Sequence, residues 1–445
     1  MALGAAAPAL PAAPTAQARF GPLVPDPDGV LALPKGFEYR IISRAGTEMS
    51  DGLLVPPRAD GMAAFNLGDN LITLVCNHEN HPALPGAFGS GNERLSAIDP
   101  AKLYDPGEGK TPGTGGTTTL VYDPRAGELR SQHLSLAGTE INCAGGGTPW
   151  KSWLSCEECF EDPGARTGRR GTVLRQKRHG YVFEVPAAET GLVQPEPLRE
   201  MGRFEHEAAA VEPRSGVIYM SEDKHRSLLY RFLPNEAGNL AAGGRLQALA
   251  IRSRPSCDTR NWDAAAPMPQ GQWFETDWID IENPDPDENT LRLDGFEQGA
   301  ARFARGEGLT LADGSLFMTA TIGGPHRLGQ VFEYRPSAFE GQPAEKDAPG
   351  QLRLFAECQP ESLLRNADNL TVAPWGDLVI YEDTSTHCGL IGMTSDGMQY
   401  PIADNAYTNS ELAGICFSPE GSVMFVNIQV RGLTLAITGP WKAVG

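Results

Sequence analysis

The chain is a succession of short apolar runs separated by turn residues, and segments of helical periodicity are scarce. Runs rich in Val, Ile, Leu, Phe and Tyr recur along the whole sequence, and Gly, Pro, Asp and Asn bound them. Such runs are typical of β-strands, because β-branched and aromatic side chains pack well on a pleated surface and the bounding residues favour tight turns. The pattern therefore predicts an all-β fold.

One unit, which consists of a strand, a turn, a second strand and a polar end, occurs in six copies. The segments GTPWKSWLSCEE (147–158) and VAPWGDLVIYED (372–383) align without a gap, and each ends in an acidic pair. Four further segments repeat the unit less closely: 66–79, 211–223, 311–321 and 416–429. Most copies continue into more strands. Repeats of about four short strands are typical of β-propellers, so we expect a six-bladed propeller.

We expect this propeller to be a single domain at residues 20–445 with inserted surface loops. The insertions are rich in Gly, Pro and charged residues, and they occupy four segments: 100–117, 160–178, 254–303 and 337–350. Residues 1–19 are mostly small residues and proline, and Ala16-Gln17-Ala18 has the form of an A-x-A cleavage site. This segment is predicted to be a disordered leader or the remnant of an export signal.

The charge and composition of the chain exclude several classes of partner. The formal net charge is −19, so a nucleic acid or an anionic membrane surface would be repelled. No uncharged apolar run approaches the ~20 residues of a membrane span, and eight cysteines in 445 residues are too few for a disulfide framework. We therefore expect small-molecule ligands, no structural nucleic acid and no membrane span.

Polar residues recur at two equivalent places in the repeats. One set begins the predicted inner strands: Asn142, Glu207, Glu307, Asn369 and Glu411. The other set ends the strands that follow: Glu79, Cys156, Glu157, Glu158, Glu222, Asp223, Glu382 and Asp383. Because antiparallel neighbours place the start of one strand beside the end of the next, both sets are expected on one face of the ring.

So many carboxylates on one face would repel one another strongly, and bound metal ions are the natural neutralising groups. Oxygen ligands suit Ca²⁺, Mg²⁺ or Fe³⁺, whereas a thiolate from Cys156 would select a softer or redox-active metal such as iron or zinc. The alternative for Cys156 is a buried structural cysteine at a strand end. Arg305 lies two residues before Glu307, on the same side of an extended strand, and is placed to bind a phosphate while Glu307 binds metal.

Five segments resemble, in order, the signature segments of the PhoX-type alkaline phosphatases. They are NCAGGGTPWKSWLSCEE, GRFEHEAAAVEPRSGVIYMSEDK, ARFARGEGL, ADNLTVAPWGDLVIYED and ELAGICFSPEGSVMFVNIQ, and the match runs from Pro34 to Trp441. The resemblance implies a six-bladed propeller with an iron and calcium cluster at the mouth of its channel and a cysteine thiolate on the iron. It also implies a periplasmic or secreted protein that is exported by the Tat route.

The resemblance also assigns residues to roles. It implies metal ligands at seven positions: Cys156, Glu157, Glu207, Glu307, Asp368, Glu382 and Asp383. Arg305 matches the arginine that holds the substrate phosphate, and Asn142 fits a polar position of the active site.

These observations together predict hydrolysis of small-molecule phosphate monoesters, in which metals and Arg305 hold the phosphoryl oxygens. One alternative is another calcium-dependent propeller hydrolase, such as a lactonase or phosphotriesterase. A second alternative is a non-catalytic propeller that binds a partner and uses calcium as a structural clip. Cys156 and Arg305 beside the carboxylates argue against the second alternative, because a structural calcium site needs neither.

Overall fold

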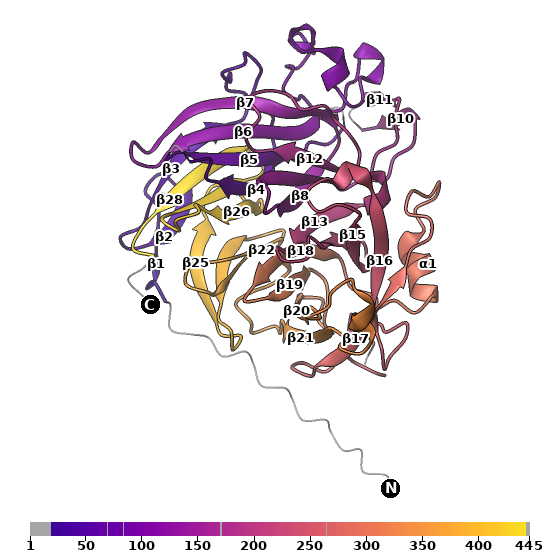
Figure 1. The fold of residues 1–445 in the computed structure, drawn as a ribbon. Helices are drawn as coiled ribbons and strands as arrows, with labels where there is room; N and C mark the ends of the chain where they lie inside the picture. Colours follow the sequence, from indigo (N-terminus) through magenta and orange to yellow (C-terminus); the bar gives the residue numbers. More distant parts are fainter. Residues whose placement is uncertain (1–18, 69, 83, 170, 264, 442–445) are drawn as a thin grey trace.

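The structure is a computed structural model that describes residues 19–441 apart from positions 69, 83, 170 and 264. The predicted leader at 1–19 therefore lies outside the described residues except for Arg19. The described chain is almost entirely strands, with one α-helix, α1 (Leu291–Glu297), at the outer edge (Figure 1). Short 3₁₀ turns fall in the connections: Leu95–Ala97, Pro100–Lys102, Gly107–Gly109, Arg199–Met201, Leu240–Ala242 and Pro343–Lys346. Among the described residues, no helix is long and apolar enough to cross a bilayer.

The strands from the first part of the chain form two antiparallel sheets and a hairpin. The first sheet has the order β4 (Ala59–Phe65), β5 (Ile72–His78), β6 (Gly115–Asp123) and β7 (Glu128–Thr139). The second has the order β8 (Asn142–Gly147), β9 (Ser152–Glu157) and β12 (Val182–Pro186). The separate hairpin consists of β10 (Gly164–Gly168) and β11 (Gly171–Arg175).

The middle of the chain forms a nine-stranded sheet. Its first five strands are β13 (His206–Val211), β14 (Ile218–Glu222), β15 (Leu229–Pro234), β16 (Gly244–Ile251) and β17 (Phe274–Asp280). It continues through β21 (Gln351–Glu357), β20 (Gln330–Arg335), β19 (Ser315–Ala320) and β18 (Gly306–Ala312). The link between the halves is the short antiparallel pairing of β17 with β21, where Phe274 lies opposite Leu352.

The last two sheets combine strands from both ends of the chain. One contains β22 (Ala367–Val372), β23 (Leu378–Glu382), β24 (Gly389–Met393) and β25 (Gln399–Asn405), followed by β2 (Leu31–Pro34) and β1 (Leu23–Val24). The other contains β26 (Leu412–Phe417), β27 (Val423–Ile428), β28 (Leu433–Thr438) and β3 (Glu38–Arg44). The N-terminal strands thus complete the C-terminal sheets and hold the ring closed.

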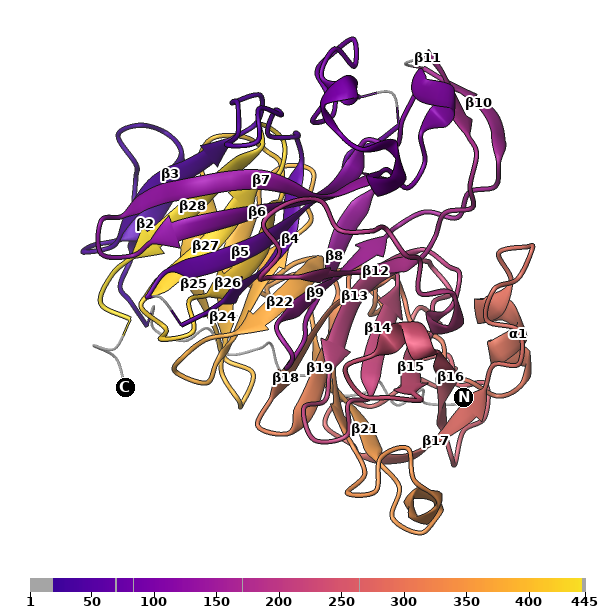
Figure 2. The same ribbon diagram turned by 45° about the horizontal axis from the view of Figure 1, so that its top comes forward.

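Six strands surround one axis in a closed ring, which gives a propeller-like arrangement (Figures 1 and 2). Each contacts the next in the order β4, β8, β13, β18, β22 and β26, and β26 contacts β4 again. Small residues permit this approach: a Cβ on Gly146 of β8 would lie 2.0 Å from the carbonyl oxygen of Ala209 in β13. The apolar core lies between neighbouring sheets, as where Leu154 and Val182 join one buried cluster with Met220 and Tyr230.

The predicted all-β, propeller-like fold is confirmed, but six separate four-stranded blades are not what the described strands form. One sheet has three strands, one has six, and β17 joins two of the expected blades into the nine-stranded sheet. The physical reason is the insertion at 254–303, which was predicted to be a loop. It contains β17, and this strand pairs with β16 on one side and β21 on the other. The expected loop at 160–178 likewise contains the β10–β11 hairpin.

An aromatic cluster joins the two chain ends. Trp441 is 4% exposed and stacks on Trp375 with ring centroids 5.5 Å apart. Its ring also meets Phe37 at 4.5 Å and Phe20 at 5.7 Å, both edge to face. Three segments that are distant in the sequence therefore share one buried contact.

We predict that Trp441→Ala lowers the free energy of unfolding by about 3 to 5 kcal/mol, because it removes a buried indole at the closure of the ring. Thermal or urea unfolding would measure the loss. Val430→Ala is the control, since Val430 is 45% exposed and should change stability by less than about 0.5 kcal/mol. Equal stability of the two variants would contradict the closing role of the cluster.

Candidate metal centre and active site

The six strands around the axis share a local irregularity near their first residues. The register shifts as in a β-bulge after Ala59, Asn142, His206, Gly306, Ala367 and Ala413. A bulge leaves an extra residue on one strand and turns its side chain to a new direction. The position after the first paired residue of the strand carries Asp60, Cys143, Glu207, Glu307 and Asp368 in five strands. In β26, where the shift begins one residue later, this position carries Ala413.

A repeated backbone hydrogen bond fixes a second set of side chains beside the first. In every repeat, the N–H that follows the second strand donates to the carbonyl oxygen just before the first strand. The donor and acceptor residues are Glu79 and Arg58, Glu158 and Ile141, Asp223 and Glu205, Thr321 and Arg305, Asp383 and Asn366, and Gln429 and Glu411. Up to three side chains in each repeat therefore lie at one end of the ring. They are those of the bulge residue, the donor residue and the acceptor residue.

These positions line one cavity of about 380 Å³, here called the acidic cavity. Its walls carry nine carboxylates: Asp60, Glu79, Glu158, Glu207, Asp223, Glu307, Asp368, Asp383 and Glu411. Arg58 and Arg305 are the two cationic side chains among its lining residues, and Cys143 supplies a thiol. His81, Tyr381 and Gln429 complete the described lining.

The carboxylates of the acidic cavity are too close together to remain ionised without cations. Burial raises the pKa of Glu207 well above its ordinary value, and repulsion from Glu307 and Glu158 raises it further. Burial and neighbouring acids act in the same direction on Asp368 and Glu411. Such shifts identify a place where a bound cation would be strongly favoured.

The cavity contains four groups of three side chains, and within each group the ligand atoms lie within 4.8 Å of one another. The groups are Cys143 with Glu158 and Glu207, Glu207 with Glu307 and Asp368, Asp368 with Asp383 and Glu411, and Asp60 with Glu79 and Glu411. Each group shares one carboxylate with the next, so the groups form a continuous row. One group contains sulfur, and the other three contain oxygen alone.

Arg305 lies at the edge of this row in a left-handed backbone conformation, with φ at 55°. Its Nε and Nη2 donate to the two oxygens of Asp223 at 2.7 and 2.6 Å. Nη2 is also 3.0 Å from Glu307, and Nη1 is 3.6 Å from Asp383. The surrounding carboxylates, with Glu307 foremost, outweigh burial and raise the pKa of Arg305, so it remains a cation.

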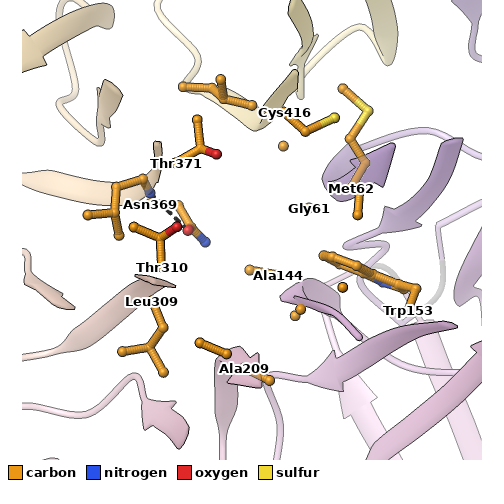
Figure 3. Close-up of a pocket in the computed structure, with 18 of the residues that line it drawn as sticks. Gly61, Met62, Ala144, Trp153, Ala209, Leu309, Thr310, Asn369, Thr371 and Cys416 are labelled. Carbon is orange, nitrogen blue, oxygen red and sulfur yellow. Dashed lines mark hydrogen bonds between the residues drawn. The ribbon is translucent and has the colours of Figure 1, made fainter. Parts of the chain in front are cut away.

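Another cavity of about 270 Å³ lies along the axis of the ring next to the acidic cavity. Figure 3 shows small and apolar side chains pointing into it from the surrounding strands, among them Ala144, Ala209 and Leu309. Tyr381 lines both spaces. The acidic side chains are therefore confined to one end of the axis.

A family model described as "Alkaline phosphatase PhoX" matches residues 18–432. The chain belongs to the PhoX family of alkaline phosphatases. It is accordingly a hydrolase of the phosphomonoesterase type. This membership favours the catalytic interpretation of the acidic cavity over a propeller that only binds a partner.

The fold agrees with that of a solved PhoX structure. Pseudomonas fluorescens PhoX in complex with vanadate, a transition state analogue, is similar with a TM-score of 0.68 and 16% identity over 96% of this chain and 98% of that chain. XC5397 from Xanthomonas campestris, a gluconolactonase, has a TM-score of 0.40 and 13% identity, over 94% of this chain and 98% of its own. No match was found among curated proteins.

Five of the predicted site residues of this PhoX-family chain meet in the acidic cavity: Glu207, Glu307, Asp368, Asp383 and Arg305. Four do not line it: Cys156, Glu157, Glu382 and Asn142. Asn142 is buried at the start of β8, where it donates to Ser155 Oγ at 2.9 Å and accepts from Thr139 at 2.7 Å. The side-chain amide of Asn142 therefore forms hydrogen bonds within the protein and does not point into the acidic cavity.

The alternation of side chains along a strand explains why only one member of each acidic pair lines the cavity. In each pair, the second residue leaves the strand and enters the cavity, while the first accepts hydrogen bonds from backbone N–H groups behind it. Glu157 accepts from Glu140 and Gly180 at 3.0 and 2.8 Å. Glu382 accepts from Arg365 and Gly389 at 2.8 and 3.1 Å.

The cysteine in the cavity is Cys143 and not Cys156. Both cysteines border the apolar cluster between neighbouring sheets, but Cys156 is fully buried there and does not line the cavity. Cys143 occupies the same bulge position as Glu207 in the next repeat, and its Sγ is close to both Glu158 and Glu207. The signal that would have found it is the alignment of the first strands: Asp60-Gly61, Cys143-Ala144 and Glu307-Gly308 are matching pairs of an acidic or thiol residue and a small one.

Other residues of the cavity were expected on the correct face but not assigned as ligands: Glu79, Glu158, Asp223 and Glu411. Asp60 and Arg58 were missed altogether, because the repeat that contains them was recognised only from residue 66 onward. Arg58 is the counterpart of Arg305 in its own repeat, and it forms an ion pair with Glu79. Since β4 and β18 are separated by two strands in either direction around the ring, the two arginines face each other across the axis.

A buried hydrogen-bond network supports the wall of the cavity behind Glu158. His179 lies between two carboxylates, with Nδ1 2.7 Å from Glu157 and Nε2 3.3 Å from Asp105. Burial alone would lower the pKa of His179, but the charge of Glu157 and hydrogen bonds to both acids raise it to about 10. The imidazolium therefore holds Glu157, and with it the strand end that positions Glu158.

We predict that His179 makes a pH-dependent contribution to stability. Because its folded pKa is raised from 6.5 to about 10, the contribution is complete below pH 6.5 and is lost as the pH rises through about 10. The difference in unfolding free energy between wild type and His179→Asn should therefore be larger at pH 7 than above pH 10, measured by urea denaturation with chelator present.

His78→Asn is the matched control for this measurement. His78 is also buried, but burial lowers its pKa to about 4, so it stays neutral over the same range. The difference between wild type and this control should not change between the two pH values. If the difference in unfolding free energy between wild type and His179→Asn were also the same at both pH values, His179 would not be charged at pH 7.

Proposed function

We propose that the acidic cavity hydrolyses phosphate monoesters with a cluster of bound iron and calcium ions. The observation that supports the proposal most directly is the continuous row of four ligand groups, one of which contains a thiol. The repulsion among nine carboxylates has no evident structural purpose. Cations would relieve it, and the thiol beside two of these carboxylates would be a further ligand for one of them.

The donor atoms divide between the two kinds of metal. Cys143 with Glu158 and Glu207 suits iron, because a thiolate prefers a softer or redox-active ion. Burial and nearby acids raise the pKa of the Cys143 thiol well above its ordinary value, so metal binding is what would ionise it. The three groups that offer only carboxylate oxygens suit calcium.

The chain's own residues would bind and orient the substrate. Arg305 and Arg58 face each other across the mouth of the axis, and each is a donor that suits phosphoryl oxygens. Asp223 holds the plane of Arg305 through two hydrogen bonds, which leaves Nη1 as the nitrogen free of hydrogen bonds among the described residues. Bound metals would supply Lewis acidity and lower the pKa of water.

The overall reaction consumes one water: an oxygen of water bonds to phosphorus, the ester P–O bond breaks, and the alcohol leaves with a proton. No serine or threonine occurs among the described residues that line the acidic cavity. This composition favours attack by water over a hydroxyl side chain that becomes phosphorylated. The two arginines would stabilise charge that develops on the phosphoryl group.

We also infer that the ring of six first strands represents a six-bladed propeller with modified blades. Six bulges and six equivalent backbone hydrogen bonds support this count, although β17 merges two sheets. Small-molecule phosphate esters would be the ligands, and a periplasmic or secreted location is proposed from the family. Residues 20–445 would then act as a single domain.

We predict that Cys143→Ser loses iron and hydrolysis of p-nitrophenyl phosphate, whereas Cys156→Ser keeps both. The physical reason is that only Cys143 has its Sγ beside two cavity carboxylates. Elemental analysis and turnover on the same samples make the measurement. Loss of iron in Cys156→Ser alone would instead make Cys156 the iron ligand. Turnover by wild type without any bound metal would contradict the metal mechanism.

We predict that Arg305→Ala lowers kcat/KM for p-nitrophenyl phosphate by about 100-fold, as expected for loss of one preorganised donor to the transition state. Arg245→Ala is the control, because Arg245 lies on β16 with a side chain that is 57% exposed. Metal content should be measured for both variants. An Arg305→Ala protein that keeps its metals and the wild-type kcat/KM would exclude the phosphate-binding role.

A further inference from the structure

A second cavity of about 540 Å³ adjoins the acidic cavity and shares Asp223 and Arg305 with it. We refer to it as the basic cavity. Its lining comes from the loop after β14, the start of α1 and the residue before β18: Asp223, Lys224, His225, Arg226, Arg292, Leu293 and Arg305. Figure 2 shows α1 beside β16 and β17, on the outer side of this sheet. A volume of this size is typical of a small-molecule site.

The charge of the basic cavity is opposite to that of its neighbour. Four of its seven lining residues are Lys or Arg, whereas the acidic cavity has nine carboxylates and two arginines. Asp223 is the one carboxylate in this lining, and Arg305 already engages both of its oxygens. The chain as a whole has more acidic than basic residues and a net charge of −19, so this local excess of basic residues is unusual for it.

The cations of the basic cavity differ in how they are held. Arg292 donates to the carbonyl oxygen of Asn289 at 3.1 Å and to Glu222 at 3.4 Å, so its direction is fixed. Lys224 Nζ is 2.8 Å from Glu205. Arg226 is exposed, and no carboxylate of the described residues pairs with it within 4 Å.

Further cations lie behind this wall. Arg260 and Arg302 both pair with Asp258, which leaves this small group with more positive than negative charge. Burial, together with the nearby Arg260 and Arg226, lowers the pKa of Arg302. Unneutralised positive charge at the surface beside a reaction site attracts anions.

The basic cavity is connected to Arg305 by the backbone. The N–H of Arg305 donates to the carbonyl oxygen of Lys224 at 2.9 Å, and the N–H of Gly306 donates to Ser227 Oγ at 3.1 Å. The loop at 224–227 and the arginine that would hold the phosphoryl group therefore form one rigid unit. An ester group that extends from a phosphoryl group at Arg305 has this cavity beside it.

We propose that the basic cavity binds an anionic group on the alcohol portion of the substrate, such as a second phosphate, a phosphonate or a carboxylate. This inference rests on the proposed function and adds a preference for the substrate class. The enzyme would favour monoesters whose alcohol carries a further anion over monoesters of neutral alcohols. Arg226 supplies the positive charge that no carboxylate of the described residues balances, and Arg292 supplies a fixed donor.

The experiment compares two substrates that have one cleavable ester each, propyl phosphate and 3-phosphonopropyl phosphate. Initial release of inorganic phosphate gives kcat/KM for both. Wild type should prefer the phosphonate by about tenfold or more, as charge-assisted hydrogen bonds contribute about 1.5 kcal/mol or more. The preference should fall with added salt, because the cavity is open to solvent.

The variant Arg226→Gln should remove this preference and leave kcat/KM for propyl phosphate unchanged. Arg245→Gln, which removes an exposed arginine on β16, should keep the preference. A wild type without preference would overturn the inference, as would a preference that the Arg226→Gln variant retains. Inorganic phosphate binding that depends on Arg226 while the substrate preference does not would assign the cavity to free phosphate and overturn it also.

Failure of the proposed function would be recognised separately, because neither substrate would then release phosphate. Calorimetric titration of 3-phosphonopropyl phosphate and propyl phosphate still tests the cavity in that case. Tighter binding of the phosphonate that is lost in the Arg226→Gln variant would support the anion site. Equal binding of the two compounds would overturn it.

Discussion

Electrostatic repulsion at one end of the axis is the constraint on which the function of this protein depends. Six strands start there, and five of them place an acid or a thiol at the same bulge position. Ionised carboxylates at this density destabilise a fold unless cations lie among them. Arg58 and Arg305 neutralise part of this charge. The negative charge that remains would favour the binding of metal ions.

The β-bulge is the local device that makes this arrangement from a repeated strand. A regular strand would direct alternate side chains to the two neighbouring sheets, and an acid there would meet apolar residues. The extra residue turns one side chain toward the axis, while the strand continues with small residues such as Ala144 and Gly308. The bulged position can therefore vary between Asp, Cys and Glu without a change in the packing between sheets.

The repeats and the polar ends were readable from the sequence, because antiparallel pairing brings equivalent positions of every repeat to one face. Glu207, Glu307, Asp368, Asp383 and Arg305 line the acidic cavity, as this pairing leads one to expect. Glu157 and Glu382 lie outside its lining, because the sequence does not reveal which member of an acidic pair leaves its strand. The segment FETDWID of β17 has no strict apolar and polar alternation, and its three acidic residues resemble those of the loop that follows it. A pairing between outer strands is a tertiary contact that no local pattern specifies.

The acidic cavity draws side chains from Arg58 at one end of the chain to Gln429 near the other. Its completion also coincides with ring closure, which needs β3 to pair with β28 and β2 to pair with β25. During synthesis, the acidic cavity therefore cannot be complete until the last strands of the chain have been made and have paired. Folding is dominated by contacts of long sequence separation, which form slowly. A nascent or truncated chain presents only part of the ligand set, so assembly of a complete metal centre is a late step that reports on the finished ring.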